Sequence, residues 1–370
     1  MSTTRRTFIQ DDVALSSASL FASQSIFPAA HAQTGDYRRI AVEEIFCPPE
    51  VITASKRIIQ ENPDLEPGFR DLIFGRTERA ANAVRRMQDV GEERLTAMDE
   101  GGIAMAVLSN WAPGVQIFGA EEGTELAALS NDRTAEVVAA RPDRFAALAT
   151  IAPQDPAAAA QEVDRAMTSL SMNGVLINSH THNEYLDDRK FWPILEACES
   201  LNAPIYLHPR VPSAQMNGLF LDYNMQSPKW GFAIEVSTHV VRLISAGVFD
   251  QFPDLKLVLG HMGEGLPFWL HRLDTFSRPE IGNTINKAPS EYIRENTVIT
   301  TSGMGWDPLL LFSHSVLGAE NILFAVDYPF GSYASDSAWM DAIPLPEADK
   351  EMIYSKNAER VFSLNGQESL

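Results

Sequence analysis

The feature that most limits how this chain can fold is the alternation, from Arg39 onward, of short apolar segments with longer amphipathic ones. The short segments are rich in β-branched residues, which is typical of buried strands, and the longer ones show the 3.6-residue period of a helix. The predicted strands are Ile40–Phe46, Ala104–Ser109, Phe145–Ile151, Gly174–Asn178, Pro204–His208, Lys256–His261, Thr297–Ser302 and Asn321–Asp327. The helical segments between them include Thr77–Asp99, Glu122–Ala140, Pro156–Leu170, Phe191–Ser200 and Ala233–Ala246. Eight βα units close a parallel sheet on itself, so we expect an α/β fold, a single-domain (β/α)8 TIM barrel.

Length and charge limit the classes of function. The chain has 370 residues, of which 45% are hydrophobic, and α/β barrels reach about 250 residues or more as one domain. The formal net charge of −20 argues against a nucleic-acid or anionic-membrane partner, because both require a basic surface. Cys47 and Cys198 are the two cysteines, and they have neither the number nor the spacing of a thiolate zinc site. We therefore expect a soluble protein that acts on a small molecule.

The first 32 residues differ in character from the rest. Arg5 and Arg6 precede a stretch rich in serine and alanine that ends in Ala30-His31-Ala32, a pattern that resembles a twin-arginine export signal and its cleavage site. Asp11 and Asp12 do not suit such a signal, and a disordered tail is the alternative. The predicted organisation is a signal peptide over residues 1–32 and the barrel over residues 33–370. The mature protein would then be periplasmic; without export it would be cytoplasmic.

Polar residues occur where a barrel enzyme would use them. In barrels of this class the active site lies at the carboxyl ends of the strands. One residue of this set lies within the first predicted strand and the others end later ones: Glu43, Asn178, His208, His261, Ser302 and Asp327. Burying so many polar groups together without a partner would be costly, so their convergence predicts a functional site.

The residue types indicate a metal centre. Imidazole nitrogen and carboxylate oxygen together suit Zn²⁺ or Mn²⁺, with Mg²⁺ as a further possibility. Glu43, His208 and Asp327 would supply three ligands and leave open positions for substrate or water. His261 is either a fourth ligand or an acid/base group, and Glu264, three residues later, would orient its ring.

Six short motifs stand at or near the ends of the predicted strands and in one loop between them. They are Glu43-Glu44-Ile45-Phe46, Tyr206-Leu207-His208-Pro209, Gly247-Val248-Phe249-Asp250 with Phe252-Pro253, Leu259-Gly260-His261-Met262-Gly263-Glu264, Thr300-Thr301-Ser302-Gly303 and Val326-Asp327-Tyr328-Pro329. Together these motifs resemble the decarboxylase branch of the amidohydrolase superfamily, which includes γ-resorcylate, 2,3-dihydroxybenzoate, salicylate and aminocarboxymuconate semialdehyde decarboxylases. The likeness extends from about Arg39 to Phe362.

The resemblance implies a divalent metal held by Glu43, His208 and Asp327, with His261 beside it and Asp327 able to carry a proton. One position departs from the family pattern: many members have Glu-x-His in the first strand, whereas this chain has Ile45 two residues after Glu43. Some hydroxybenzoate decarboxylases of the family also have an apolar residue there. Hydrolytic members usually need that histidine, so the departure favours decarboxylation.

A second His-x-His motif, His180-Thr181-His182, follows the fourth strand instead of lying in the first. Its position predicts a loop or substrate-contact feature, and the alternative is a substitute ligand for the missing histidine.

The predicted function is non-oxidative, metal-dependent decarboxylation of a hydroxybenzoate-like or related unsaturated carboxylic acid, and we expect the enzyme to be a homo-oligomer, a dimer or tetramer. Asp327 would protonate the carbon that bears the carboxylate, and His261 and Glu264 would manage the supply of protons. Aromatic residues near the strand ends could form the walls of the substrate site: Phe46, Trp111, Trp306, Tyr328 and Phe330. Two alternatives stay open, a metal-dependent hydrolase of a lactone, ester or amide and a binding protein without catalysis.

Overall fold

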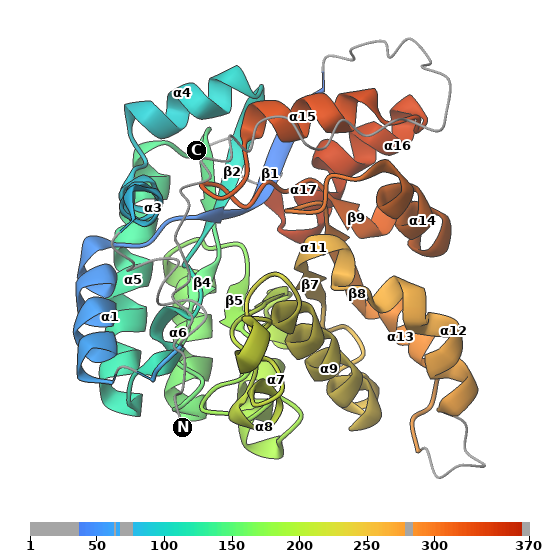
Figure 1. Ribbon diagram of the computed structural model, residues 1–370, viewed down its shortest axis with the longest axis horizontal. Helices are drawn as coiled ribbons and strands as arrows, with labels where there is room; N and C mark the ends of the chain where they lie inside the picture. Colours follow the sequence, from blue (N-terminus) through green and yellow to red (C-terminus); the bar gives the residue numbers. More distant parts are fainter. Residues whose placement is uncertain (1–36, 63, 67–76, 278–283, 365–370) are drawn as a thin grey trace, which may run out of the picture. The chain divides into compact units, whose positions relative to one another are not determined.

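Parallel strands arranged around a common centre form the core of the computed structural model (Figure 1), which describes residues 37–62, 64–66, 77–277 and 284–364. The predicted signal segment, residues 1–32, lies outside these ranges. The strands are β1 (Arg39–Ile45), β2 (Ile103–Ser109), β3 (Phe145–Ala147), β4 (Ala149–Thr150), β5 (Val175–Asn178), β6 (Ile205–His208), β7 (Leu257–Leu259), β8 (Thr297–Thr300) and β9 (Ile322–Leu323). β3 and β4 are two parts of one predicted strand, separated at Leu148.

Hydrogen bonds close the strands into a barrel. The pairing order is β1-β2-β3 and β4-β5-β6-β7-β8-β9, and all pairs are parallel. The two groups are joined because Leu148 N donates to Leu108 O at 2.8 Å, just before β4 begins. The ring closes where Val42 N of β1 donates to Phe324 O, next to β9, at 3.1 Å. The expected (β/α)8 barrel is confirmed.

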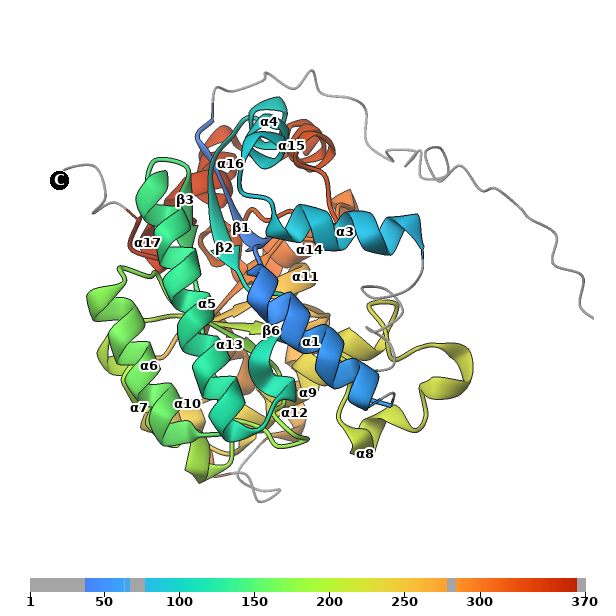
Figure 2. The same ribbon diagram turned by 90° about the vertical axis from the view of Figure 1, so that its left-hand side faces the viewer.

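Helices cover the outside of the barrel, as Figures 1 and 2 show. They are α1 (Pro49–Glu61), α3 (Glu78–Gln88), α4 (Glu92–Glu100), α5 (Ala120–Ala140), α6 (Pro156–Ser169), α7 (Trp192–Ser200), α8 (Ala214–Asn217), α9 (Gly231–Ser245), α10 (Val248–Gln251), α12 (Leu266–Phe276), α13 (Pro289–Asn296), α14 (Asp307–Leu317), α15 (Tyr333–Ala342), α16 (Glu347–Glu351) and α17 (Asn357–Val361). The short element α11 (Gly260–Gly263) has left-handed backbone angles at His261 and Met262 and lies directly after β7, at the end of the strand. No helix among the described residues has the length and apolar character needed to cross a bilayer.

The predicted helical segment Thr77–Asp99 is divided into α3 and α4. The Asp89 carboxylate accepts hydrogen bonds from Gly91 N at 3.1 Å and from Arg94 N at 2.7 Å. An aspartate that binds free N–H groups at a helix start favours a new helix over continuation of the old one. The period of apolar residues is kept on both sides of this break, which is why the sequence alone did not show it.

Alternating side chains of the strands build two layers of core. One set fills the barrel interior and includes Ile40 and Val42 of β1, Val107 of β2 and Val258 of β7. The other set faces the surrounding helices and includes Ala41 on β1. Because both faces of the strands are buried, the polar residues of the site are placed at the strand ends, where the packed interior stops.

Candidate metal centre

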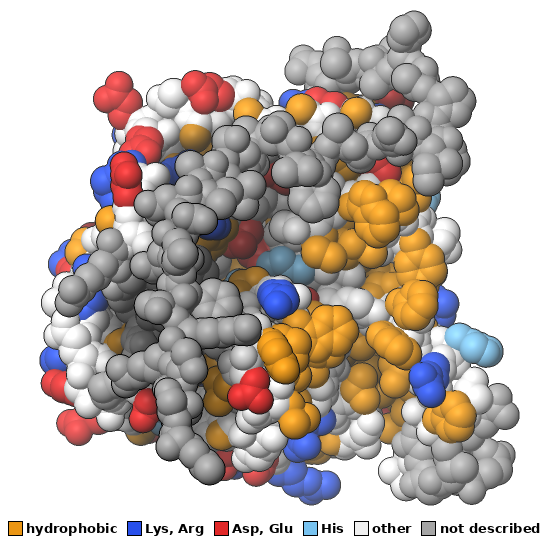
Figure 3. Space-filling model, viewed as in Figure 1, with side chains coloured by type: hydrophobic (Ala, Val, Ile, Leu, Met, Phe, Trp, Pro, Cys, Tyr) orange, Lys and Arg blue, Asp and Glu red, His pale blue; other side chains and the backbone are white. Residues whose placement is uncertain are grey.

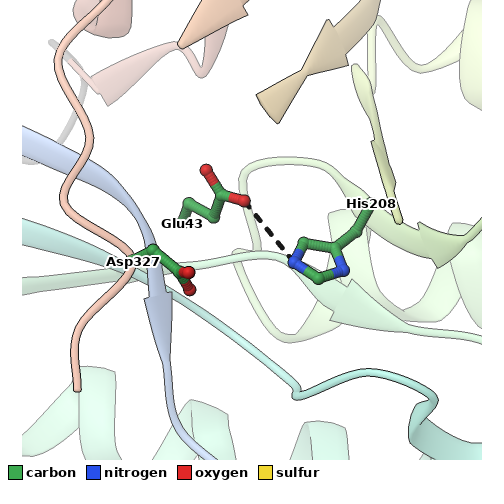
Figure 4. A group of neighbouring side chains, drawn as sticks. All are labelled: Glu43, His208 and Asp327. Atoms are coloured by element: carbon green, nitrogen blue, oxygen red, sulfur yellow. Dashed lines mark ion pairs between the residues drawn. The ribbon is translucent and has the colours of Figure 1, made fainter. Parts of the chain in front are cut away.

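Glu43, His208 and Asp327 converge at the carboxyl end of the barrel. Each offers a ligand atom that lies within 4.8 Å of the ligand atoms of the other two. Glu43 belongs to β1, His208 ends β6, and Asp327 follows β9. Figure 4 shows the three side chains directed toward a common space, with His208 Nε2 at 3.5 Å from Glu43 Oε1. The structure thus brings together the three side chains that the sequence suggested as metal ligands.

A β-bulge directs Glu43 into this space. The register of β1 against β2 shifts at this residue, since Val42 pairs with Val107 and Glu44 with Leu108. Glu43 is therefore an extra residue in the strand, and its φ of 79° is in the left-handed region. Bulges of this kind re-aim a side chain near an active site. The bulge allows Glu43 to follow Val42 on the inner side of the barrel.

Hydroxyl groups of β8 and the residues after it hold one oxygen of Glu43. Ser302 Oγ donates to Glu43 Oε2, and Thr300 Oγ1 donates to the same atom at 3.2 Å. Gly260 leaves room on the other side, because a Cβ atom at this position would lie 3.0 Å from Glu43 Oε1. Only one oxygen of the carboxylate is therefore occupied by hydrogen bonds.

His208 is prepared to act as a neutral ligand. Its Nδ1 lies 2.7 Å from the carbonyl oxygen of Pro209; because a carbonyl can only accept, Nδ1 carries the proton and Nε2 has the free lone pair. Burial lowers the pKa of His208 to about 4, against the opposing effect of Glu43. A neutral imidazole with a fixed tautomer is the form that binds a metal ion.

His261 lies beside the three residues on a left-handed turn. Positive φ values continue through His261, Met262, Gly263, Glu264 and Gly265, a conformation that costs about 1–2 kcal/mol for each non-glycine residue. His261 Nδ1 lies 2.8 Å from Glu264 Oε1, and its Nε2 lies 3.6 Å from Glu43 Oε1. Burial opposes protonation of His261, but Glu43 and Glu264 outweigh it and raise its pKa to about 10. The turn thus holds the imidazole of His261 next to the cluster, between the carboxylates of Glu43 and Glu264.

Unpartnered oxygen atoms show that the cluster fits a cation. Glu43 Oε1 and Asp327 Oδ1 are buried and have no hydrogen-bond partner. Burial and the Glu43 carboxylate raise the pKa of Asp327 well above its usual range. Buried carboxylate oxygens without a donor are costly, and a divalent ion would satisfy both. With His208 Nε2 they form the mixed nitrogen and oxygen donor set that suits Mn²⁺ or Zn²⁺.

The other candidate ligands are not available for this role. His180 Nε2 lies 3.0 Å from Val211 O, and His180 Nδ1 accepts from Asn183 N at 3.3 Å. Both ring nitrogens of this buried residue are therefore occupied, and burial lowers its pKa to about 2. His182 is exposed. Ile45 packs in an apolar cluster with Trp111 and Val211, and neither His180 nor His182 replaces the histidine that β1 lacks.

Two of the five predicted aromatic wall residues remain accessible. Trp306 and Phe330 are 59% and 36% exposed, whereas Phe46, Trp111 and Tyr328 are buried in the packing of the core. Asn178, another predicted strand-end residue, is bound by Gln116, whose Oε1 accepts from Asn178 N at 2.7 Å. The side chain of Asn178 donates from Nδ2 to Trp111 O at 3.5 Å, and Asn178 is not one of the three residues whose ligand atoms cluster.

A buried group that the sequence did not reveal combines serine, histidine and glutamate. Ser179 Oγ lies 3.1 Å from His239 Nδ1 and 2.9 Å from Glu235 Oε1. His239 Nε2 accepts the N–H of Leu186 at 3.0 Å, so the proton is on Nδ1, and burial lowers the pKa of His239 to about 3. An imidazole in this tautomer cannot accept a proton from Ser179 at Nδ1. The group is a packing network and not a nucleophilic triad.

The fold and the cluster define a metal-dependent (β/α)8 enzyme, and comparisons with known proteins agree. The amidohydrolase family model matches residues 82–364. The γ-resorcylate decarboxylase of Polaromonas sp. strain JS666 is 34% identical over 341 residues, which cover 88% of this chain and 99% of that protein. The chain therefore belongs to the amidohydrolase family, and within it to the metal-dependent decarboxylases that such relatives represent.

Solved structures show the same relation. The 5-carboxyvanillate decarboxylase of Sphingomonas paucimobilis has a TM-score of 0.85 and 44% identity, covering 88% of this chain and 99% of its own. A dihydroxybenzoic acid decarboxylase of Polaromonas sp. JS666, with bound manganese and the inhibitor 2-nitroresorcinol, has a TM-score of 0.80 and 32% identity, covering 90% of this chain and 100% of its own. The expected dependence on a divalent metal ion is confirmed.

Proposed function

We propose that this protein removes CO₂, without oxidation, from a benzoate that carries a hydroxyl group next to its carboxylate. The observation that carries the proposal is the pair of buried, unpartnered oxygens, Glu43 Oε1 and Asp327 Oδ1, beside the free Nε2 of His208. Relatives that decarboxylate γ-resorcylate and 5-carboxyvanillate support this substrate class.

Asp327 and His261 have different roles in the proposed reaction. Loss of CO₂ requires a proton at the ring carbon that bears the carboxylate, because cleavage would otherwise leave a free carbanion. Asp327 is the proposed donor of that proton, because its buried carboxyl group lies in the cluster beside Glu43 and His208. His261, bound to Glu264 through Nδ1, returns a proton to the site after each turnover. When bound, the divalent ion supplies Lewis-acid stabilisation for negative charge on the substrate carboxylate and the adjacent hydroxyl oxygen.

The test is a panel of 2-, 3- and 4-hydroxybenzoates and dihydroxybenzoates with the metal-loaded protein, with CO₂ as the measured product. We expect turnover of acids with an ortho hydroxyl and little turnover of the meta and para isomers, since these cannot place both oxygens and the reacting carbon correctly. Equal turnover of ortho and para isomers would contradict the proposed binding mode. Reaction with esters or lactones alone, without CO₂ release, would show a hydrolase.

Manganese is the metal we propose first, and zinc second. Relatives have been solved with manganese, and the donor set of one imidazole and two carboxylates accommodates either ion. Metal analysis of the purified protein, followed by reconstitution of the stripped protein with each ion, tests this order. Higher turnover with zinc than with manganese would reverse it.

An exposed aromatic patch supports the proposal that the protein is a homo-oligomer. The patch comprises Phe268, Trp269 and Phe276 of α12 and Phe312 of α14, and Phe268 is 72% exposed. Figure 3 shows hydrophobic side chains gathered on the part of this face that α9, α12 and α14 occupy. Large exposed apolar patches commonly mark interfaces, and we propose a second copy of this chain as the occupant.

Light scattering tests this proposal. The native protein should have at least twice the mass of one chain, which is 40.8 kDa for the full sequence, and Phe268→Ser should lower the mass. Leu219→Ser, at another exposed apolar residue outside the patch, is the control and should leave the mass unchanged. A native protein of single-chain mass would contradict the proposal.

Export through the twin-arginine pathway is proposed from the sequence of residues 1–32. Arg5 and Arg6 are the residues on which this pathway would depend. In a bacterial host with the pathway, the mature protein should begin near Gln33 and be found in the periplasm. Replacement of both arginines with lysine should retain it in the cytoplasm, and an intact N-terminus in the periplasmic or total protein would contradict export.

A further inference from the structure

The second acid of the Glu43-Glu44 pair is fully buried and binds a different part of the chain. Glu44 Oε1 accepts the N–H of Val326 at 3.1 Å, and Glu44 Oε2 accepts the N–H of Tyr328 at 3.2 Å. These two residues stand on either side of Asp327 in the sequence. One carboxylate therefore holds the backbone before and after the proposed proton-carrying residue.

Glu44 acts at the seam where the barrel closes. β9 ends at Leu323, and beyond it the backbone of β1 donates at two points: Val42 N to Phe324 O at 3.1 Å and Ile45 N to Tyr328 O at 2.9 Å. The bulge at Glu43 lies between these points and interrupts the regular ladder. The side chain of Glu44 supplies acceptors for two N–H groups in this interval.

The conformation of Asp327 requires such support. Its φ is 63°, in the left-handed region that costs a non-glycine residue about 1–2 kcal/mol, and residues in such conformations persist where their surroundings fix them. Arg94, which is fully buried, donates to Ile45 O at 2.5 Å, and this bond fixes the backbone of β1 next to Glu44. The support for Asp327 is therefore itself held in place.

We propose that Glu44 is a positioning residue, which sets the direction of the Asp327 carboxylate through the two backbone N–H groups on either side of it. Glu44 touches neither metal nor substrate in this role. The bulge would thus direct the Glu43 ligand, and the carboxylate of Glu44 would fix the position of the Asp327 ligand relative to it. The proposal rests on the metal-dependent reaction proposed above, so its test measures metal binding separately from turnover.

The decisive variant is Glu44→Gln, which keeps the size of the side chain but places an amide NH₂ against one of the two N–H donors. Loss of outer support for a metal ligand typically weakens metal affinity by about 10–100-fold. We expect the Mn²⁺ dissociation constant to rise by a factor in that range, as measured by competition with a chelator. In protein saturated with metal, kcat should fall by roughly tenfold or more while KM changes little, because a misdirected Asp327 impairs the reaction and not substrate binding.

The matched control is Asp341→Asn. Asp341 is bound through both carboxylate oxygens by Arg39 at the opposite end of β1, at 2.8 and 2.9 Å, so this variant also removes a carboxylate that supports β1. It should lower the melting temperature without changing metal affinity or kcat. If Glu44→Gln does no more than this control, the proposal is wrong.

A second variant keeps the question answerable if Glu44→Gln does not fold. Glu44→Asp retains the carboxyl group but is one methylene shorter, so it cannot reach both N–H groups from the same backbone position. It should also weaken Mn²⁺ binding, and full native affinity would mean that the two hydrogen bonds to the backbone around Asp327 do not matter, contrary to the proposal. A native protein that binds Mn²⁺ but decarboxylates none of the panel would overturn the proposed function, and the affinity measurements would still decide the role of Glu44.

Discussion

His208 presents a single free nitrogen to the cluster, because the Pro209 carbonyl occupies the other. His208→Ala would remove this donor and leave two buried carboxylates facing each other without the ion that balances them. We expect purified His208→Ala to retain only a minor fraction of the metal found in the native protein, as measured by mass spectrometry of the dissolved metal. His182→Ala, at an exposed histidine, should retain all of it. Full metal occupancy in His208→Ala would contradict the ligand assignment.

Asp327 is proposed to combine metal binding with proton delivery, and Asp327→Asn separates these roles. An asparagine oxygen can still coordinate a cation, but an amide cannot deliver the proton. We expect turnover to fall by roughly 10³-fold or more even where the variant is saturated with metal, in keeping with the usual contribution of acid–base catalysis. The measurement is CO₂ release at saturating Mn²⁺, with bound metal determined in the same sample. Substantial turnover would assign the proton to another group.

Ile45 lies two residues after Glu43, where the family pattern predicts a histidine, and it is buried in an apolar cluster with Trp111 and Val211. Ile45→His should increase metal affinity by adding a donor but reduce turnover of ortho-hydroxybenzoates, because it takes a position on the ion that the substrate would use. Ile45→Leu is the control for altered packing. The opposite result, with weaker metal binding in Ile45→His, would place this side chain outside the reach of the metal.

Among the elements, the left-handed turn at residues 261–265 gives a direct test of backbone conformation. Gly265 has a φ of 80°, and an added Cβ would meet no atom within 4 Å; at Gly263, with a φ of 69°, the Cβ would lie 2.7 Å from Ile299 Cγ2. Gly265→Ala should therefore lower the free energy of unfolding by about 1–2 kcal/mol, which is the cost of the left-handed backbone conformation for a non-glycine residue. Gly263→Ala should cost about 1–3 kcal/mol more, because it overpacks the core. Urea unfolding measures both, and equal losses would contradict this reasoning.

The elements also show what the sequence could reveal. Strands such as Ile205–His208 were predicted to within a residue, because a short β-branched segment carries its own signal and the strand ends bring the polar residues together. The bulge at Glu43 was not predicted, since Thr300 and Ser302, which bind Glu43, are 257 and 259 residues away in the sequence. The role of Glu44 was missed for the same reason: its partners lie at the other end of the chain.

At the scale of the whole molecule, the contacts that close the barrel also bring the metal-binding residues together. Strands β1 and β9 come from opposite ends of the described chain, and the residues that close the ring, Val42 and Phe324, lie beside Glu43 and close to Asp327 in the sequence. The barrel pattern could be read from eight local signals. The geometry of the closure could not, because it depends on contacts between the first and last units.

The unpartnered oxygens of Glu43 and Asp327 have a consequence for the folding equilibrium. A ligand that binds only the native state stabilises it in proportion to the logarithm of its concentration, by about 1.4 kcal/mol for each tenfold rise above the dissociation constant and about 4 kcal/mol at a thousandfold excess. Calorimetry of the stripped protein at increasing Mn²⁺ should show a melting temperature that rises steadily, and Glu43→Gln should flatten this dependence. A melting temperature that does not respond to metal would contradict the proposal that metal binding stabilises the folded protein. The metal-free protein is the form that unfolds most readily and is then open to proteolysis. Because Glu43 and Asp327 need the ion, the lifetime of the folded chain in a cell should depend on the supply of metal.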